Sequence, residues 1–261
     1  MNNIFEEWLS DRTLYKTLRD WNPGLAPLIV ERHPKTPDDN AAFISRIICG
    51  KPGYGKSMYA YKIGAKVFWI FDGCDRVEQE EECYKQSLDA IIYRPEELFN
   101  KVKIQRKKAE PALLWVIDDG SVHVGRALFD QDRKCYRRLQ STVPTLREDV
   151  TGLLITTPKA NLLAKPFREF IDEKCEIKLA SSFKENRRFA NHYFRRYFPD
   201  DHNFRMQLPF RDRFSSLCPQ PFYSWYLTKK RKALNEYQEL CDRLIALSDD
   251  TTEDDDEDAG T

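Results

Sequence analysis

The sequence predicts an α/β fold: a three-layer sandwich built on a mainly parallel central sheet. Two observations lead to this class. Short apolar runs alternate along the chain with helical patterns, which is the order that parallel βαβ units require. The run "ALLWVI" at residues 112–117 is continuously apolar, as is typical of strands buried on both faces. No apolar run approaches the roughly 18–20 residues of a membrane span, so membrane insertion is not expected.

Local patterns predict the elements in chain order. Residues 4–20 carry apolar positions at helical spacing, and the sequence "NPGLAP" ends that helix. Strands are expected at residues 43–49, 90–93, 112–117, 152–157 and 175–179. Helices are expected at residues 57–65, 95–109, 132–147, 159–170 and 222–247, with an acidic loop at 71–88.

Composition changes divide the chain into four expected segments. These are an N-terminal helical extension at 1–40, a core at 41–182, a basic and aromatic α/β extension at 183–247 that ends in a helix, and a disordered acidic tail at 248–261. Acids and bases number 42 each, but residues 249–258 hold eight acids and no base, so the rest of the chain has a surplus of +8. Such a tail either improves solubility or competes with nucleic acid for a basic face.

Cysteine and histidine usage bears on the compartment. The seven cysteines are widely spaced, no CxxC pair occurs and only four histidines are present. This pattern argues against a disulfide framework or a zinc site and favours a reducing cytoplasm. The N-terminal sequence "MNNIFEEWLSDR" also lacks the basic and apolar regions of a signal peptide.

The glycine-rich sequence "CGKPGYGKS" at residues 49–57 matches G-x-x-x-x-G-K-[ST], between an expected strand and an expected helix. In this motif backbone N–H groups surround phosphate, helped by the positive end of the helix dipole. The lysine reaches the β- and γ-phosphates and the serine hydroxyl binds Mg²⁺. The residues expected to bind ATP are Gly50, Lys51, Pro52, Gly53, Tyr54, Gly55, Lys56, Ser57 and Met58. The alternative is a glycine turn before a helix.

Two acids follow the apolar run 112–117. A carboxylate at the end of a buried strand is unfavourable unless it has a function. Asp118 is therefore expected to bind Mg²⁺, together with Ser57, and Asp119 to orient or deprotonate the attacking water. The alternative is that both aspartates cap a helix beginning at "GSVHVG".

The strand expected at 152–157 ends in Thr156 and Thr157. A hydroxyl at this place can sense the γ-phosphate, and Thr157 is the candidate because it is the last residue before a proline. Ordinary strand-end threonines are the alternative.

These three features, in this order, resemble the additional-strand class of P-loop ATPases. The segment "LREDVTGLLITTPKANLLAKPFREF" is similar to the FtsK–HerA DNA-pumping ATPases, and "IDDGSVHVG" and "TTP" resemble segments of small ATPases of archaeal viruses and plasmids. The chain is also similar to zonula-occludens-toxin-like phage assembly ATPases, and the loop would suit AAA+ ATPases too. The resemblance covers about residues 41–180. Asp119 stands where many relatives have Glu, and Thr157 where many have Gln.

The resemblance implies a homo-oligomeric ring in which an arginine of one subunit reaches the γ-phosphate bound by its neighbour. Arg147, before the sensor strand, and Arg168, after it, are the candidates for this catalytic role. FtsK–HerA analogy favours Arg147 and AAA+ analogy favours Arg168. A surface salt bridge is the alternative for each.

The expected target is nucleic acid. Basic clusters occur at residues 103–108, 187–196 and 229–232, and the second also contains Phe189, Tyr193 and Phe194. Cations bind phosphates and aromatic rings stack on bases, although a strand with an aromatic core face and a basic solvated face has the same pattern. The expected function is Mg²⁺-dependent ATP hydrolysis that drives translocation or packaging of double-stranded DNA for a virus or plasmid, with viral or plasmid protein partners. The alternatives are a regulatory nucleotide switch and a protein-assembly or secretion ATPase.

Overall fold

The computed structural model describes residues 17–35, 42–125, 132–171, 173–180, 186–198 and 203–250. Most of the helix expected at 4–20 and the acidic tail beyond residue 250 lie outside these residues. Residues 17–20 form a turn. In the sequence "NPGLAP", expected to be a break, helix α2 (Leu25–Glu31) already begins at the fourth residue.

The strands form one seven-stranded sheet in the order β2-β3-β4-β1-β5-β6-β7. Their bounds are β1 (Ile44–Cys49), β2 (Ile91–Ile92), β3 (Ala112–Ile117), β4 (Val150–Thr157), β5 (Glu173–Leu179), β6 (Arg187–Phe198) and β7 (Asn203–Ser215). Strands β1 to β5 are parallel, and β6 and β7 continue the sheet in antiparallel pairing. Strand β4 lies between β1 and β3, as the additional-strand class requires. The predicted fold class is therefore confirmed, and the sheet is consistent with a P-loop NTPase fold.

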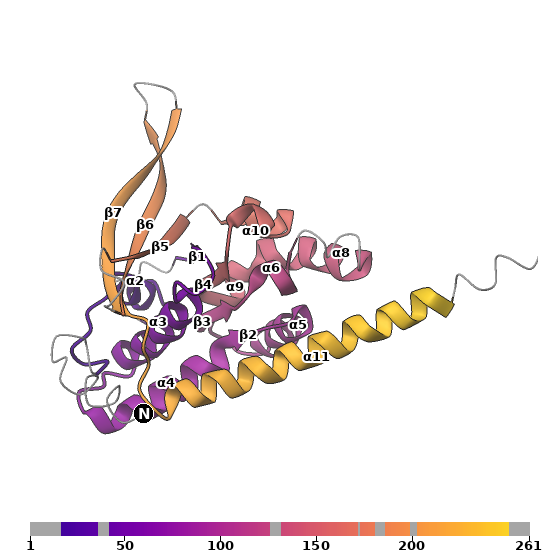
Figure 1. Ribbon diagram of the computed structural model, residues 1–261. Coiled ribbons are helices and arrows are strands. Elements are labelled where there is room, and N and C mark those ends of the chain that lie inside the picture. Colours follow the sequence, from indigo (N-terminus) through magenta and orange to yellow (C-terminus); the bar gives the residue numbers. More distant parts are fainter. Residues whose placement is uncertain are drawn as a thin grey trace, which may run out of the picture. The chain divides into compact units, whose positions relative to one another are not determined.

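Helices cover both faces of this sheet (Figure 1). On one face, α3 (Lys56–Phe71) packs against α2 and against α4 (Glu80–Ala90). On the other face a core of aliphatic and aromatic side chains joins the sheet to α5 (Pro95–Gln105), α8 (Arg133–Thr142) and α10 (Lys165–Phe170). The short elements are η1 (Val77–Gln79), α6 (Gly120–His123), η2 (Val143–Thr145), α9 (Leu146–Asp149) and η3 (Ala160–Leu162).

The prediction of an acidic loop at 71–88 is wrong, because most of that range is helical. Glu80, Glu81 and Glu82 occupy the first turn of α4, where negative charge is stabilised by the helix dipole. The buried residues of α4 include Cys83, Tyr84 and Ser87, so an inward stripe exists beneath an acidic surface. The prediction failed because it was based on the acidic composition of the segment and not on the spacing of its apolar residues.

The chain consists of two compact units, Met1–Pro219 and Gln220–Thr261. The first contains the whole sheet, and the second contains α11 (Phe222–Asp250), which includes the helix expected at 222–247. The four-segment division remains a prediction. In the described part of the chain, no helix combines the length and the apolar character needed to cross a membrane.

Candidate nucleotide-binding site

The glycine loop, the aspartate pair and the threonine pair meet at one edge of the sheet. They follow or end β1, β3 and β4, which are neighbours and parallel. Cys49, the last residue of β1, pairs with Thr157, and Ile117, the last residue of β3, pairs with Ile155. The register thus brings three segments that are far apart in the sequence to the carboxyl edge of the sheet, where α/β proteins bind ligands.

The glycine loop uses backbone conformations that favour glycine. Gly53 has φ +78° and Gly55 has φ +87°, both in the left-handed region. A Cβ atom on Gly55 would also lie 3.2 Å from the Cβ of Ser216. Gly55 is the N-cap residue of the 16-residue helix α3 and offers no side-chain cap. The dipole of α3 therefore places partial positive charge at the loop, where it would stabilise an anion.

Lys56 begins α3 and reaches across the loop. Its side chain is 8% exposed and its Nζ donates a hydrogen bond to the carbonyl oxygen of Lys51 at 3.1 Å. Ser57, the next residue, is half-buried, and Met58 is buried. The outer part of the loop, at residues 51–53, is exposed. The Lys56 ammonium and the Ser57 hydroxyl thus both belong to the first turn of α3, which directly follows the glycine loop.

Asp118 is 1% exposed and is held by Thr156, not by Thr157. The Thr156 hydroxyl donates to Asp118 Oδ1 at 2.5 Å and accepts from the backbone N–H of Asp119 at 3.0 Å. The Thr157 hydroxyl instead donates to the carbonyl oxygen of Lys159 at 3.1 Å. Thr156 is therefore a site residue that sequence reasoning passed over. The signal that identifies it is the strand register: Ile117 pairs with Ile155, so Asp118 and Thr156 are the next residues of the two neighbouring strands.

Asp119 has φ +50°, the only positive φ of a non-glycine residue in the described chain. It occupies the N-cap position of the four-residue helix α6, but its side chain makes no capping hydrogen bond. Left-handed backbone in a residue other than glycine costs about 1 kcal/mol and is often found at functional sites. The capping alternative therefore explains the position of Asp119 but not its side chain.

The two candidate arginines are exposed and lie on short helices outside the glycine loop. Arg147 is on α9, directly before β4, and so lies at the amino edge of the sheet. Arg168 is on α10, whose last residue Phe170 packs against Phe43, the residue just before β1, with ring centroids 5.2 Å apart. No described contact joins either arginine to the glycine loop of its own chain.

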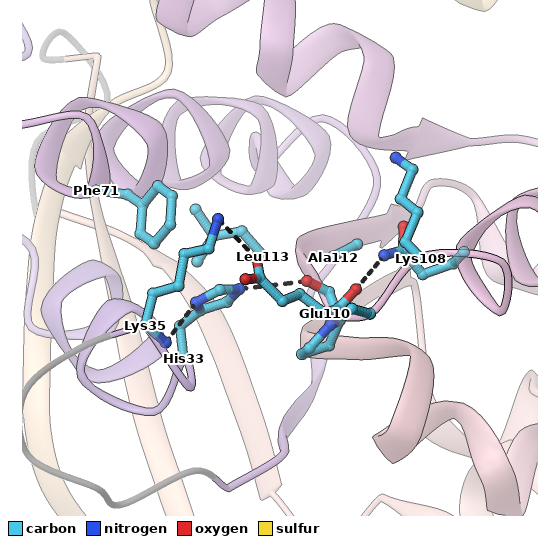
Figure 2. A pocket seen from close by; sticks show the side chains of 10 residues that line it. His33, Lys35, Phe71, Lys108, Glu110, Ala112 and Leu113 are labelled. Carbon is cyan, nitrogen blue, oxygen red and sulfur yellow. Dashed lines mark hydrogen bonds and ion pairs between the residues drawn. The ribbon is translucent and has the colours of Figure 1, made fainter.

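A pocket of about 330 Å³ lies at the amino end of β3 and is lined by His33, Lys35, Phe71, Gln105, Lys108, Ala109, Glu110, Pro111, Ala112 and Leu113 (Figure 2). Its polar groups contact one another: Lys35 forms an ion pair with Glu110 at 2.6 Å, and His33 Nε2 lies 3.2 Å from the carbonyl oxygen of Pro111. Because it is at the amino edge, the pocket is separate from the site formed at the strand carboxyl ends.

No model of a known protein family matches the chain. A curated relative, the uncharacterized protein B-251 of Sulfolobus spindle-shape virus 1, is 28% identical over 130 residues. The match covers 49% of this chain and 48% of that protein, so the chain spans about half the length of this relative. Among solved structures, an ATPase domain matches with a TM-score of 0.35 and 10% identity, over 77% of this chain and 95% of that chain. The resemblance to the FtsK–HerA group remains a prediction.

Proposed function

We propose that the chain is a Mg²⁺-dependent P-loop ATPase that acts as a motor on double-stranded DNA. One observation carries this proposal. The ends of three neighbouring parallel strands bring together a glycine loop, a buried aspartate and a hydroxyl that orients that aspartate. Such positioned charges, held before the reaction begins, are the main means of catalysis in phosphoryl transfer.

The residues present fit both ATP and Mg²⁺. The left-handed Gly55 and the start of α3 form a cradle that a Cβ atom would crowd. Ser57 and Asp118 would supply the hydroxyl and carboxylate oxygens that Mg²⁺ prefers. When bound, Mg²⁺ neutralises charge on the β- and γ-phosphates. Lys56 would hold the same phosphates from the other side of the loop.

The remaining roles concern water and the neighbouring subunit. Asp119 would orient or deprotonate the attacking water. Thr157 remains the proposed sensor of the γ-phosphate, while Thr156 would position Asp118. In a homo-oligomeric ring, Arg147 or Arg168 of one subunit would stabilise transition-state charge in its neighbour. Both arginines are exposed and thus accessible to a second copy.

The biological setting that we propose is DNA translocation or packaging for a virus or plasmid in the host cytoplasm. The core at 41–182 would hydrolyse ATP and the extension at 183–247 would contact DNA. The surplus of positive charge outside the acidic tail supports a polyanionic partner.

A regulatory nucleotide switch is the second candidate function. Asp119 favours it, because the aspartate side chain is one methylene shorter than glutamate and the backbone N–H of Asp119 is fixed by Thr156. A carboxylate with less reach would slow hydrolysis and prolong the bound state.

The test is steady-state ATP hydrolysis with and without linear duplex DNA. Lys56→Ala provides the blank, and Lys85→Ala, which removes an exposed lysine on α4, is the matched control. We expect turnover that DNA stimulates in the wild type and in Lys85→Ala but not in Lys56→Ala. Nucleotide binding without turnover under both conditions would overturn the motor and leave the switch.

A further inference from the structure

The ribbon of β6 and β7 extends beyond the other strands of the sheet (Figure 1). Its register pairs Arg187 with Ser215, Phe189 with Arg213 and Asn191 with Arg211. Because side chains alternate along a strand, these residues share one face of the ribbon. Arg187, Arg211 and Arg213 are exposed on it. We call these five residues (Arg187, Phe189, Asn191, Arg211 and Arg213) the arginine face.

Two of these arginines are held in place by their neighbours. Arg211 Nε donates to Asn191 Oδ1 at 2.7 Å. The guanidinium carbons of Arg211 and Arg213 lie 5.1 and 5.9 Å from the centre of the Phe189 ring, within cation–π range. Side chains that are already ordered lose less conformational entropy when they bind. The contacts thus prepare both guanidinium groups for a partner in front of the ribbon.

The ribbon is strongly positive and keeps its acid on the other face. The sequence of β6 contains four arginines and that of β7 three, with Asp212 the single acid of both strands. Asp212 is 4% exposed and accepts hydrogen bonds from the Tyr59 hydroxyl and the Gly24 N–H, on the inner side. Its charge is therefore used inside the fold and offsets little of the positive charge of the arginine face.

We propose that the arginine face binds the phosphate backbone of double-stranded DNA. The inference rests on the proposed function and assigns its DNA contact to one surface. Two observations favour a duplex: arginine forks match phosphate geometry, and the Phe189 ring already contacts two guanidinium groups instead of being presented for base stacking. Another aromatic residue of this cluster, Phe194, lies near Arg46, with 4.9 Å from the guanidinium carbon to the ring centre.

The same geometry shows that each of the two interpretations of the cluster at 187–196 fits one of its phenylalanines. Phe194 belongs to the inner side, as an aromatic core face predicts. Phe189 lies between arginines on the outer side, which that interpretation does not predict. In the described part of the ribbon, one phenylalanine therefore faces the core and the other lies among exposed arginines. The proposed nucleic-acid contact depends on the arginines more than on the aromatic rings.

The experiment measures binding of nucleotide-free, full-length protein to a fluorescein-labelled duplex by anisotropy over a range of salt concentrations. The variant is Arg211→Gln/Arg213→Gln. The matched control, Lys85→Gln/Lys165→Gln, removes the same charge from two exposed residues, on α4 and α10, that lie outside the basic clusters. We expect the arginine variant to bind about tenfold or more weakly, and its plot of log K against log salt to be shallower by roughly 1.8, at about 0.9 per lost phosphate contact. The control should change affinity by less than about twofold.

Further variants and DNA substrates distinguish the possible reasons for a negative result. Arg211→Lys/Arg213→Lys keeps the charge and is expected to bind with intermediate affinity, and unchanged thermal midpoints show that each variant is folded. Equal losses in the arginine and lysine variants, or an unchanged arginine variant, would overturn the arginine face but not the motor. Preferential binding of single-stranded DNA would overturn the choice of duplex. Absence of DNA binding by the wild type, despite ATP hydrolysis, would overturn both the arginine face and the nucleic-acid part of the proposed function.

Discussion

The carboxyl edge of the sheet and the region beneath the ribbon both bury charged side chains, with different results. Beneath the ribbon, Arg46, Tyr59, His192 and Asp212 form what we call the inner cluster. Arg46 and His192 are 1% and 0% exposed, and each member contacts another member. At the carboxyl edge, in contrast, Asp118 accepts a hydrogen bond from Thr156, and Lys56 donates one to the carbonyl oxygen of Lys51. Lys51 belongs to the part of the glycine loop that is exposed to solvent.

The hydrogen bonds of the inner cluster fix its protonation. An Arg46 guanidinium nitrogen contacts His192 Nδ1 and can only donate, so Nδ1 accepts and the neutral ring carries its proton on Nε2. That N–H faces Asp212 Oδ2 at 3.2 Å. Burial, followed by the charge of Arg46, lowers the pKa of His192 despite Asp212. Burial alone would raise the pKa of Asp212, but the hydrogen bonds from His192, Tyr59 and Gly24 lower it overall.

The contrast separates two uses of a buried charge. The members of the inner cluster come from β1, α3, β6 and β7, so the cluster connects the ribbon to the first strand and its helix. Gly24, just before α2, and Glu173 on β5 also bond to it. At the carboxyl edge the charges lie at strand ends and beside glycines, where we propose that ATP and Mg²⁺ bind. Variants in the first region should therefore change stability, and variants in the second should change turnover.

Lys56→Ala is expected to have the largest effect. It removes the ammonium that would face the phosphates, and ATP hydrolysis should fall by about 10²–10³-fold. The measurement is phosphate release, with thermal unfolding as a second readout. A similar loss of activity together with a large fall in the melting temperature would contradict the prediction that variants at the carboxyl edge change turnover and not stability.

Asp212→Ala should act on stability. It leaves His192, Tyr59 and the Gly24 N–H without their acceptor, and we expect a loss of about 3–5 kcal/mol in the free energy of unfolding. Urea titration gives the value. The control Asp75→Ala removes an acid that is 83% exposed and should change stability by less than about 0.5 kcal/mol. Equal effects of the two variants would contradict a structural role for the inner cluster.

Thr156→Val compared with Thr157→Val distinguishes the two threonines. Thr156→Val removes the hydroxyl that orients Asp118, and turnover should fall by about 10–100-fold, as for other groups that position a metal ligand. Thr157→Val tests the proposed sensor, and its effect should appear in turnover with little change in the Mg²⁺ dependence. Measuring hydrolysis over a range of Mg²⁺ concentrations separates them. An unchanged Mg²⁺ dependence in Thr156→Val would argue against the positioning role.

The smallest expected effect is a pH dependence of stability. Because the pKa of folded His192 is lowered, the unfolded chain binds a proton first as the pH falls through about 6.5, so stability is present above that pH and declines below it. The lowered pKa of Asp212 acts in the same direction at more acidic pH. The His192 contribution is at most about 1.4 kcal/mol per pH unit.

The check is urea unfolding between about pH 7.5 and about pH 5.5 in the wild type and in His192→Gln. The variant should show a flatter dependence of unfolding free energy on pH. An identical slope in both proteins would assign the effect to another group.

Local patterns were sufficient for the central strands and for the site motifs. The apolar run of β3, the glycine loop and the acids behind them each require their residue types at fixed spacing, so they can be read without the fold. Helix α4 and the start of α2 could not be read in this way, because their buried stripes are hidden by acids in one case and by Pro and Gly in the other.

By itself the sequence determined the fold class, since backbone sterics and helix periodicity are local properties. For the same reason it predicts phosphate binding at residues 50–58, and that role remains a prediction. The tertiary structure decided what depends on register between distant segments. It selected Thr156 as the partner of Asp118, assembled the inner cluster from residues as far apart as Arg46 and His192, and placed Phe189 among the arginines. Each of these contacts joins chain segments that only strand pairing and packing bring within hydrogen-bonding or ring-contact distance.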